Sequence, residues 1–154
     1  MYEKIINILK KGKIKYSEYN HESVLDYDAA KRVRERFNLK GVESKSLFIK
    51  SKSNKYYVFV TLEEKRMNSK KIKKLIGEKI SIALGEELEE ITGMTPGCAS
   101  PFGYSKDISM IVDKDVFKSE KFLFSPGVPE ITIEIKGKDI QNIIELLDNP
   151  IIYY

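Results

Sequence analysis

Apolar positions along the chain repeat with two different periods, which predicts short helices interleaved with short strands. Spacings of three and four residues indicate helices at 2–11, from about 26 to 37, and at 69–76, 86–91 and 139–147. Alternating or continuous apolar runs indicate strands at 14–19, 46–49, 56–62, 79–84, 108–113, 122–124 and 131–135. This order of elements is typical of one mixed α/β (α+β) domain.

The segment 56–62 is apolar on both faces at its centre, so we expect a strand in the middle of the sheet. Its hairpin partner is expected at 46–49, because Ser53-Asn54 lies between the two apolar runs. Two helices begin after residues that cap helices well, Asp26 or Asp28 for one and Asn68 or Ser69 for the other. The second of these is expected to end at Gly77.

A loop at 92–103 is the most unusual segment, with six Gly, Pro or Ser residues in twelve positions. Loops of this length in compact domains are usually functional. The glycines on either side of Cys98-Ala99-Ser100 would let the backbone approach a ligand and direct N–H groups at it. The alternative is an ordinary surface Ω-loop.

Lys45 is a second candidate for chemistry. If a strand begins at Ser44, Lys45 shares a face with Leu47 and Ile49, so its ammonium could enter a pocket beside that apolar face. There it could bind phosphate or stabilise charge that develops on an ester. The alternative is a lysine at the strand edge that extends into water.

The chain has one cysteine, Cys98, and one histidine, His21, so neither an internal disulfide nor a zinc site of these residues is expected. A Cys–His nucleophile pair is not supported, because no Asn or Asp that would orient the histidine can be identified. Simple packing of a small Cys98 side chain is the alternative. The sequence also lacks the glycine patterns of P-loop and dinucleotide-binding proteins.

Composition narrows the class of protein. The 154 residues are 42% hydrophobic and 32% charged, with no apolar run long enough to cross a bilayer, so we expect a soluble cytoplasmic protein without a membrane partner. Residues 1–75 carry 20 Lys or Arg and 9 Asp or Glu, a net charge of +11, whereas residues 76–154 carry 7 and 14, a net charge of −7. This asymmetry suggests a polyanionic partner for the basic half. A merely solvated lysine-rich surface is the alternative.

Several of these features occur in the order and spacing of one known family. They are His21 before Asp28-Ala29-Ala30, Lys45 before Ser46–Ile49, the GxxxP pattern of Gly97–Pro101, and Gly127 before the strand at 131–135. The chain thereby resembles the YbaK/ProX family, the free-standing relatives of the editing domain inserted in bacterial prolyl-tRNA synthetases.

The resemblance implies one editing domain over residues 1–154, with a curved, barrel-like mixed sheet wrapped by short helices. It implies an aminoacyl-tRNA deacylase that edits mischarged tRNA in trans, with tRNA-Pro and prolyl-tRNA synthetase as candidate substrate and partner. No metal or cofactor is implied, because in the family water attacks with help from the substrate's own 2′-hydroxyl.

Carried over to this sequence, the resemblance makes Lys45 the catalytic residue. The implied substrate-binding residues are His21, Gly97, Cys98, Ala99, Ser100, Pro101 and Gly127. Seven basic residues on two helices would contact tRNA phosphates, namely Arg32, Arg34, Arg36, Lys70, Lys71, Lys73 and Lys74.

Three departures from the family pattern leave the amino-acid specificity open: Ser46 after Lys45, the Cys-Ala-Ser centre of the loop, and the proline-rich segment 125–130. A non-catalytic sensor of aminoacyl-tRNA or of an amino acid, using the same pocket, is therefore the alternative function.

Overall fold

The computed structural model describes residues 1–154 and contains five α-helices and eight strands. The helices are α1 (Tyr2–Lys11), α2 (Tyr27–Phe37), α3 (Ser69–Ile76), α4 (Gly85–Thr92) and α5 (Asp139–Leu146), with a short 3₁₀ helix η1 (Lys114–Lys118). The strands are β1 (Tyr16–Asn20), β2 (Val42–Ser51), β3 (Tyr56–Leu62), β4 (Ile80–Ile82), β5 (Ser109–Val112), β6 (Lys121–Phe124), β7 (Ile131–Lys136) and β8 (Ile151–Tyr153). None of the helices combines the length and apolar character needed to cross a bilayer.

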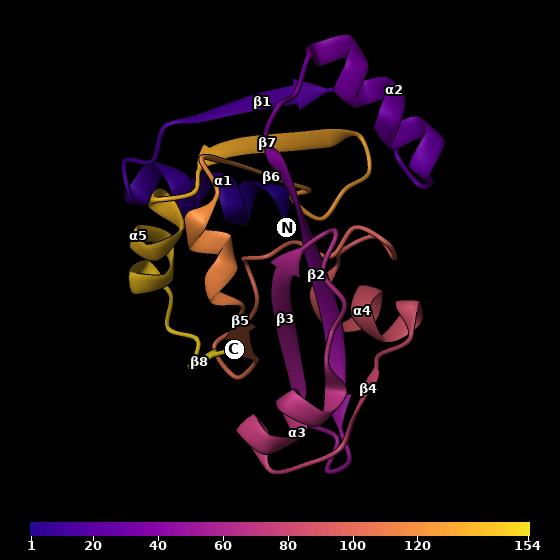
Figure 1. Cartoon of the computed structure of the whole chain (residues 1–154), viewed down its shortest axis with the longest axis vertical. Helices are drawn as coiled ribbons and strands as arrows, with labels where there is room; N and C mark the ends of the chain where they lie inside the picture. The colour runs from indigo at the N-terminus through magenta and orange to yellow at the C-terminus, as the bar shows by residue number, and fades with distance from the viewer.

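All eight strands belong to one sheet in the order β1-β7-β6-β2-β3-β5-β8, with β4 paired to β2 beside this path. The pairs β2–β6, β3–β5 and β5–β8 are parallel, and the other pairs are antiparallel. The sheet is strongly curved, since β1 and β7 run across the long axis of the molecule whereas β2 and β3 run along it (Figure 1). The expected α+β class and the curved mixed sheet are confirmed.

The helices cover the two faces of the sheet unequally. The larger core packs α1, through Ile5 and Leu9, and α5, through Ile140 and Ile143, against one face. On the other face, α3 covers one end of the sheet and α2 covers the other end. Figure 1 places α2 and α3 at opposite ends of the long axis, so the middle of this face has no helix over it.

Pairing along one edge of β2 is interrupted, and this interruption positions the candidate site. On that edge β6 pairs with Val42 and Glu43, and β4 pairs with Ile49–Ser51, so the stretch between them has no strand partner. The Phe48 carbonyl accepts from the Ala83 amide at 2.9 Å on this edge, whereas the Glu43 carbonyl accepts from the Glu63 amide at 3.0 Å on the β3 side. Because alternate residues direct their backbone groups to opposite edges, the amide and carbonyl of Ser46 face the gap.

Most predicted elements are present, with shifted ends. The helix at 69–76 is confirmed, since Asn68 caps it by accepting the Lys71 amide at 3.2 Å and Gly77 ends it in the left-handed conformation at φ 81°. The apolar run at 56–62 forms the central strand β3. Strand β2 begins at Val42 rather than at 46, and η1 and β8 were not expected from the sequence.

The position of α4 depends on Glu87. Its Oε1 atom accepts hydrogen bonds from Lys50 Nζ at 2.7 Å and from the Tyr56 hydroxyl at 2.8 Å, and its Oε2 atom accepts the Leu84 amide at 2.9 Å. The hydrogen bond from Lys50, followed by those from Leu84 and Tyr56, lowers the pKa of Glu87 to about 2. These contacts tie α4, and therefore the loop that follows it, to β2 and β3.

We expect the carboxylate of Glu87 to make the stability of the protein depend on pH in the acid range. Because the pKa in the folded state lies below the ordinary value of 4.5, the stabilisation is complete above pH 4.5 and is lost as the pH falls toward 2. Glu87→Gln should lower the melting temperature at neutral pH. On acidification, the melting temperature of the variant should fall less than that of wild type, as measured by circular dichroism. Glu90→Gln, an exposed change on the same helix, is the control. Parallel pH profiles for wild type and Glu87→Gln would contradict this assignment.

Candidate active site

Two adjoining cavities, of about 930 Å³ and 520 Å³, lie beside the interrupted edge of β2. They share part of their walls, so they meet where β2 faces the loop that follows α4. The shared lining residues are Glu43, Ser44, Glu63, Gly97, Cys98 and Ser125.

The smaller cavity brings Lys45 together with the glycine-proline loop, since Lys45, Gly97, Cys98 and Ala99 all line it. Lys45 is half-buried on β2, and none of the ion pairs of the structure involves it. Its ammonium is therefore available to a ligand.

The buried carboxylate of Asp113, next to the strand partner of Lys45, is already neutralised. Thr61 pairs with Lys45 in the register of β2 and β3, and its hydroxyl donates to Asp113 Oδ2 at 2.7 Å. Asp113 is buried and forms an ion pair with Lys65 at 2.6 Å. Lys45 is the one cation among the lining residues of the smaller cavity, and it has no ion-pair partner.

Hydrogen bonds inside the loop decide which backbone amides remain free. The Cys98 amide donates to the Thr95 carbonyl at 2.9 Å, and the Ser100 amide faces Met94 Sδ at 3.3 Å. Pro101 has no amide hydrogen. The amides of Gly97 and Ala99 donate to no other group of the chain, so these two are the free donors among the loop residues that line the smaller cavity.

Two glycines shape this region through their backbone conformation. Gly97 has φ +88°, which favours glycine, although a side chain there would meet nothing within 4 Å. Gly127 has φ +93°, and a Cβ atom there would lie 3.0 Å from side-chain atoms of both Met1 and Met94. The Gly127 carbonyl accepts the Thr95 amide at 3.0 Å and so holds the loop in place.

Three of the predicted substrate-binding residues stand behind the cavity walls. Ser100, Pro101 and Gly127 are buried and line neither cavity. The Ser100 carbonyl accepts the Tyr104 hydroxyl at 2.7 Å, which anchors the end of the loop. The structure therefore gives these residues a supporting position rather than a place on the cavity surface.

His21 lines the larger cavity under α2, together with Gly97 and Cys98. Its Nδ1 atom lies 2.7 Å from the Glu22 carbonyl oxygen, and its Nε2 atom lies 2.9 Å from Thr132 Oγ1. Because the carbonyl can only accept, Nδ1 carries a hydrogen, and the neutral ring then accepts from the threonine hydroxyl. Both nitrogens are engaged, so His21 forms part of the wall.

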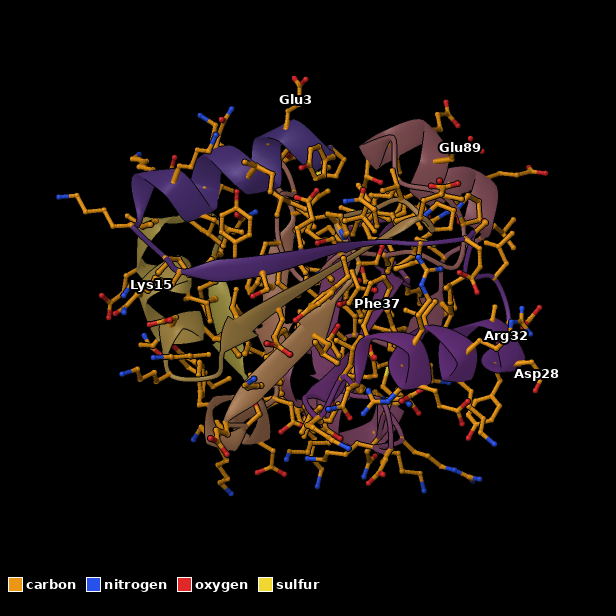
Figure 2. The ribbon with its side chains drawn as sticks, turned by 90° about the horizontal axis from the view of Figure 1, so that it is seen from above. Glu3, Lys15, Asp28, Arg32, Phe37 and Glu89 are labelled. Carbon is orange, nitrogen blue, oxygen red and sulfur yellow. The ribbon has the colours of Figure 1, made fainter.

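The basic residues of the two helices differ in their surroundings. Arg32 and Arg36 lie 3.7 Å and 3.4 Å from the carboxylate of Glu22, and Arg34 forms an ion pair with Glu43 at 2.9 Å. Figure 2 shows Arg32 on the outer side of α2, pointing away from the sheet, whereas Phe37 points inward. On α3, the predicted phosphate contacts Lys70, Lys73 and Lys74 are exposed, and Lys71 lies 4.0 Å from the centre of the Tyr154 ring.

Sequence reasoning missed Glu43, Ser44, Glu63 and Ser125, which line both cavities. Glu43 stands two residues before Lys45 on the same strand, so the period of a strand could have placed both side chains on one face. No group of three or more His, Cys, Asp or Glu side chains is arranged to hold a metal ion.

The fold and the sequence are those of a family of editing domains. The chain belongs to the aminoacyl-tRNA editing domain family, whose model matches residues 21–143 and thus covers every lining residue of the two cavities. It is similar to the prolyl-tRNA editing protein ProX of Acetoanaerobium sticklandii, with 24% identity over 153 residues, 94% of this chain and 91% of ProX.

Two solved structures show the same fold. The hypothetical protein APE2540 superposes with a TM-score of 0.78 at 17% identity, over 97% of both chains. A candidate trans-editing enzyme for prolyl-tRNA synthetase superposes with a TM-score of 0.74 at 19% identity, over 97% of this chain and 93% of that chain. The expected membership in the YbaK/ProX family is confirmed.

We expect the thiol of Cys98 to react slowly in the folded protein. Cys98 is 5% exposed, and burial raises the pKa of its thiol, so little thiolate is present at neutral pH. The measurement is the rate of reaction with a chromogenic disulfide at neutral pH, with the urea-unfolded chain as the reference. Equal rates in the two states would contradict the placement of this side chain.

Proposed function

We propose that this chain is an aminoacyl-tRNA deacylase that hydrolyses the ester of mischarged tRNA in trans. One observation carries the proposal: an unpaired lysine, Lys45, and two free amides, of Gly97 and Ala99, line the same cavity. Membership in the editing-domain family supports the aminoacyl ester of tRNA as the substrate class.

The proposed reaction uses this geometry in two ways. The amides of Gly97 and Ala99 donate to the ester carbonyl oxygen, which gains negative charge as water attacks the carbonyl carbon. Lys45 holds the terminal nucleotide or stabilises the same developing charge. The proton of the water passes, with help from the 2′-hydroxyl of the substrate, to the 3′-oxygen as the ester bond breaks. The products are the free amino acid and tRNA.

A thiol nucleophile is not part of the proposal. Cys98 is buried, and its sulfur forms no hydrogen bond with His21. Both ring nitrogens of His21 are hydrogen-bonded to other groups, the Glu22 carbonyl and the Thr132 hydroxyl. A Cys–His pair requires the base within hydrogen-bonding reach of the nucleophile.

The names of the relatives suggest where to begin the search for the substrate. One relative is a prolyl-tRNA editing protein, and one structural neighbour is described as acting for prolyl-tRNA synthetase. We therefore propose mischarged tRNA-Pro as the first substrate to test and prolyl-tRNA synthetase as the first partner. The decisive experiment is a panel of mischarged tRNAs that includes tRNA-Pro. Tight binding without hydrolysis of any member would favour a non-catalytic sensor instead.

Lys45→Ala should reduce deacylation at least about tenfold, a loss of ~1.4 kcal/mol of transition-state stabilisation. Thermal stability should remain close to that of wild type, because Lys45 forms no ion pair that the change would break. The measurement is kcat/KM on the fastest substrate of the panel, with Lys106→Ala, an exposed lysine elsewhere, as the control. Wild-type turnover by Lys45→Ala would remove the lysine from the proposed mechanism.

Charge reversal on the two basic helices should weaken tRNA binding without affecting the chemical step. The changes are Arg32→Glu with Arg36→Glu on α2, and Lys70→Glu, Lys73→Glu and Lys74→Glu on α3. Each lost phosphate contact should make the log–log dependence of binding on salt shallower by about 0.7 to 0.9. KM for aminoacyl-tRNA should rise, and hydrolysis of a minimal aminoacyl-adenosine ester should stay nearly constant.

The two helices are best tested separately, because they lie at opposite ends of the long axis (Figure 1). Helix α2 borders the larger cavity, which supports the proposal that α2 rather than α3 meets the acceptor end, and α3 is farther along the same face. If neither reversal changes KM or the salt dependence, the positive charge of residues 1–75 serves solvation and tRNA is held elsewhere.

A further inference from the structure

Glu43 occupies a position that the proposed reaction does not yet use. It lines both cavities, at the place where they meet, and it precedes Lys45 by two residues on β2. Side chains two apart on a strand lie on the same face, so both charged side chains extend from the same face of β2. Even so, these two groups form no ion pair with each other.

Arg34 of α2 holds the carboxylate from one side only. Its NH1 atom donates to Glu43 Oε1 at 2.9 Å, and its NH2 atom donates to the Gly41 carbonyl at 3.1 Å, which fixes the guanidinium between two acceptors. No group of the chain donates to Glu43 Oε2. Ser46 Oγ is the single buried side-chain N or O atom without a hydrogen-bond partner. Glu43 Oε2 also lacks a partner, so it is not a buried atom and solvent reaches it.

The groups proposed to hold the ester, which line the smaller cavity, would themselves disfavour a cationic ligand. Lys45 is positive, and the free amides of Gly97 and Ala99 present the positive ends of their dipoles. An aminoacyl ester carries an α-ammonium group one carbon atom from its carbonyl, so an ester held by these donors brings a cation close to them. An accepting group is therefore needed nearby.

We infer that the free oxygen of Glu43 binds the α-ammonium group of the aminoacyl ester, so that a free amino group is part of what the site recognises. This inference rests on the proposed function and makes Glu43 a positioning residue that orients the ester toward Lys45 and the loop amides. Burial raises the pKa of Glu43 and the hydrogen bond from Arg34 opposes this, so a second cation would further favour the ionised carboxylate.

Glu63 is the other carboxylate that lines both cavities, and it is exposed. It lies beside Glu43, because its amide donates to the Glu43 carbonyl at 3.0 Å. An exposed carboxylate binds an ammonium weakly, since water competes for both groups. Glu63→Gln is therefore the matched control for Glu43→Gln, with the same chemical change on the same cavity wall.

The test compares two stable ligands that differ at one group, 3′-(L-alanylamino)-3′-deoxyadenosine and its L-lactoyl counterpart, in which a hydroxyl replaces the ammonium. Binding is measured by calorimetry at about pH 6.5, where an α-amino group is mostly protonated. We expect wild type to bind the alanyl ligand at least tenfold more tightly. Glu43→Gln should reduce this ratio to threefold or less, and Glu63→Gln should leave it near the wild-type value.

The ratio separates recognition from structural damage. If Glu43 serves only to anchor Arg34, Glu43→Gln lowers the melting temperature and weakens both ligands equally, and an unchanged ratio overturns the inference. Equal binding of the two ligands by wild type also overturns it, as does failure to bind either one or loss of the ratio in Glu63→Gln. The proposed function is judged separately by hydrolysis of the tRNA panel, so deacylation by wild type with no preference for the ammonium would refute the inference alone.

Discussion

The interrupted pairing along β2 is the constraint on which the site depends. A ten-residue strand is held at one end by β6 and at the other end by β4, and its middle is left open on that edge. Unpaired backbone groups inside a protein are costly unless a ligand or water satisfies them. The loop after α4 lies across this opening without forming a strand, and the space that remains is the pair of cavities. The gap is the part of the β2 edge that neither β6 nor β4 reaches.

Ion pairs within the chain engage several of the charged groups at the opening and leave Lys45 and one oxygen of Glu43 without a partner. Asp113 pairs with Lys65, and Arg34 pairs with one oxygen of Glu43. Lys45 keeps no partner, and its half-buried position reduces the screening that water provides.

Local patterns were sufficient to predict most of the fold. The helix at 69–76 carries its cap, its apolar stripe and its terminal glycine within ten residues, so every signal for it is local. The start of β2 was missed because the segment 42–45 consists mostly of charged and small residues. Their burial depends on α2 and β6, and β6 is distant in sequence. Strand β8 was missed because three residues at the end of the chain carry little periodicity, and only pairing with β5 makes them a strand.

The main residues of the candidate site could also be predicted from the sequence, whereas the details of its hydrogen bonding depend on tertiary contacts. Lys45 and the loop stand out in the sequence, and the structure brings them to one cavity. Which loop amides are free could not be predicted, since that depends on hydrogen bonds to Thr95 and on the sulfur of Met94. The proposed donors are backbone groups, so substitutions at the surrounding wall residues can change the shape of the cavity without removing these donors. In the proposed mechanism the chemistry depends on the loop amides and on Lys45, whereas the selection of the amino acid depends on the side chains around them, which gives a physical reason for specificity to vary within one family.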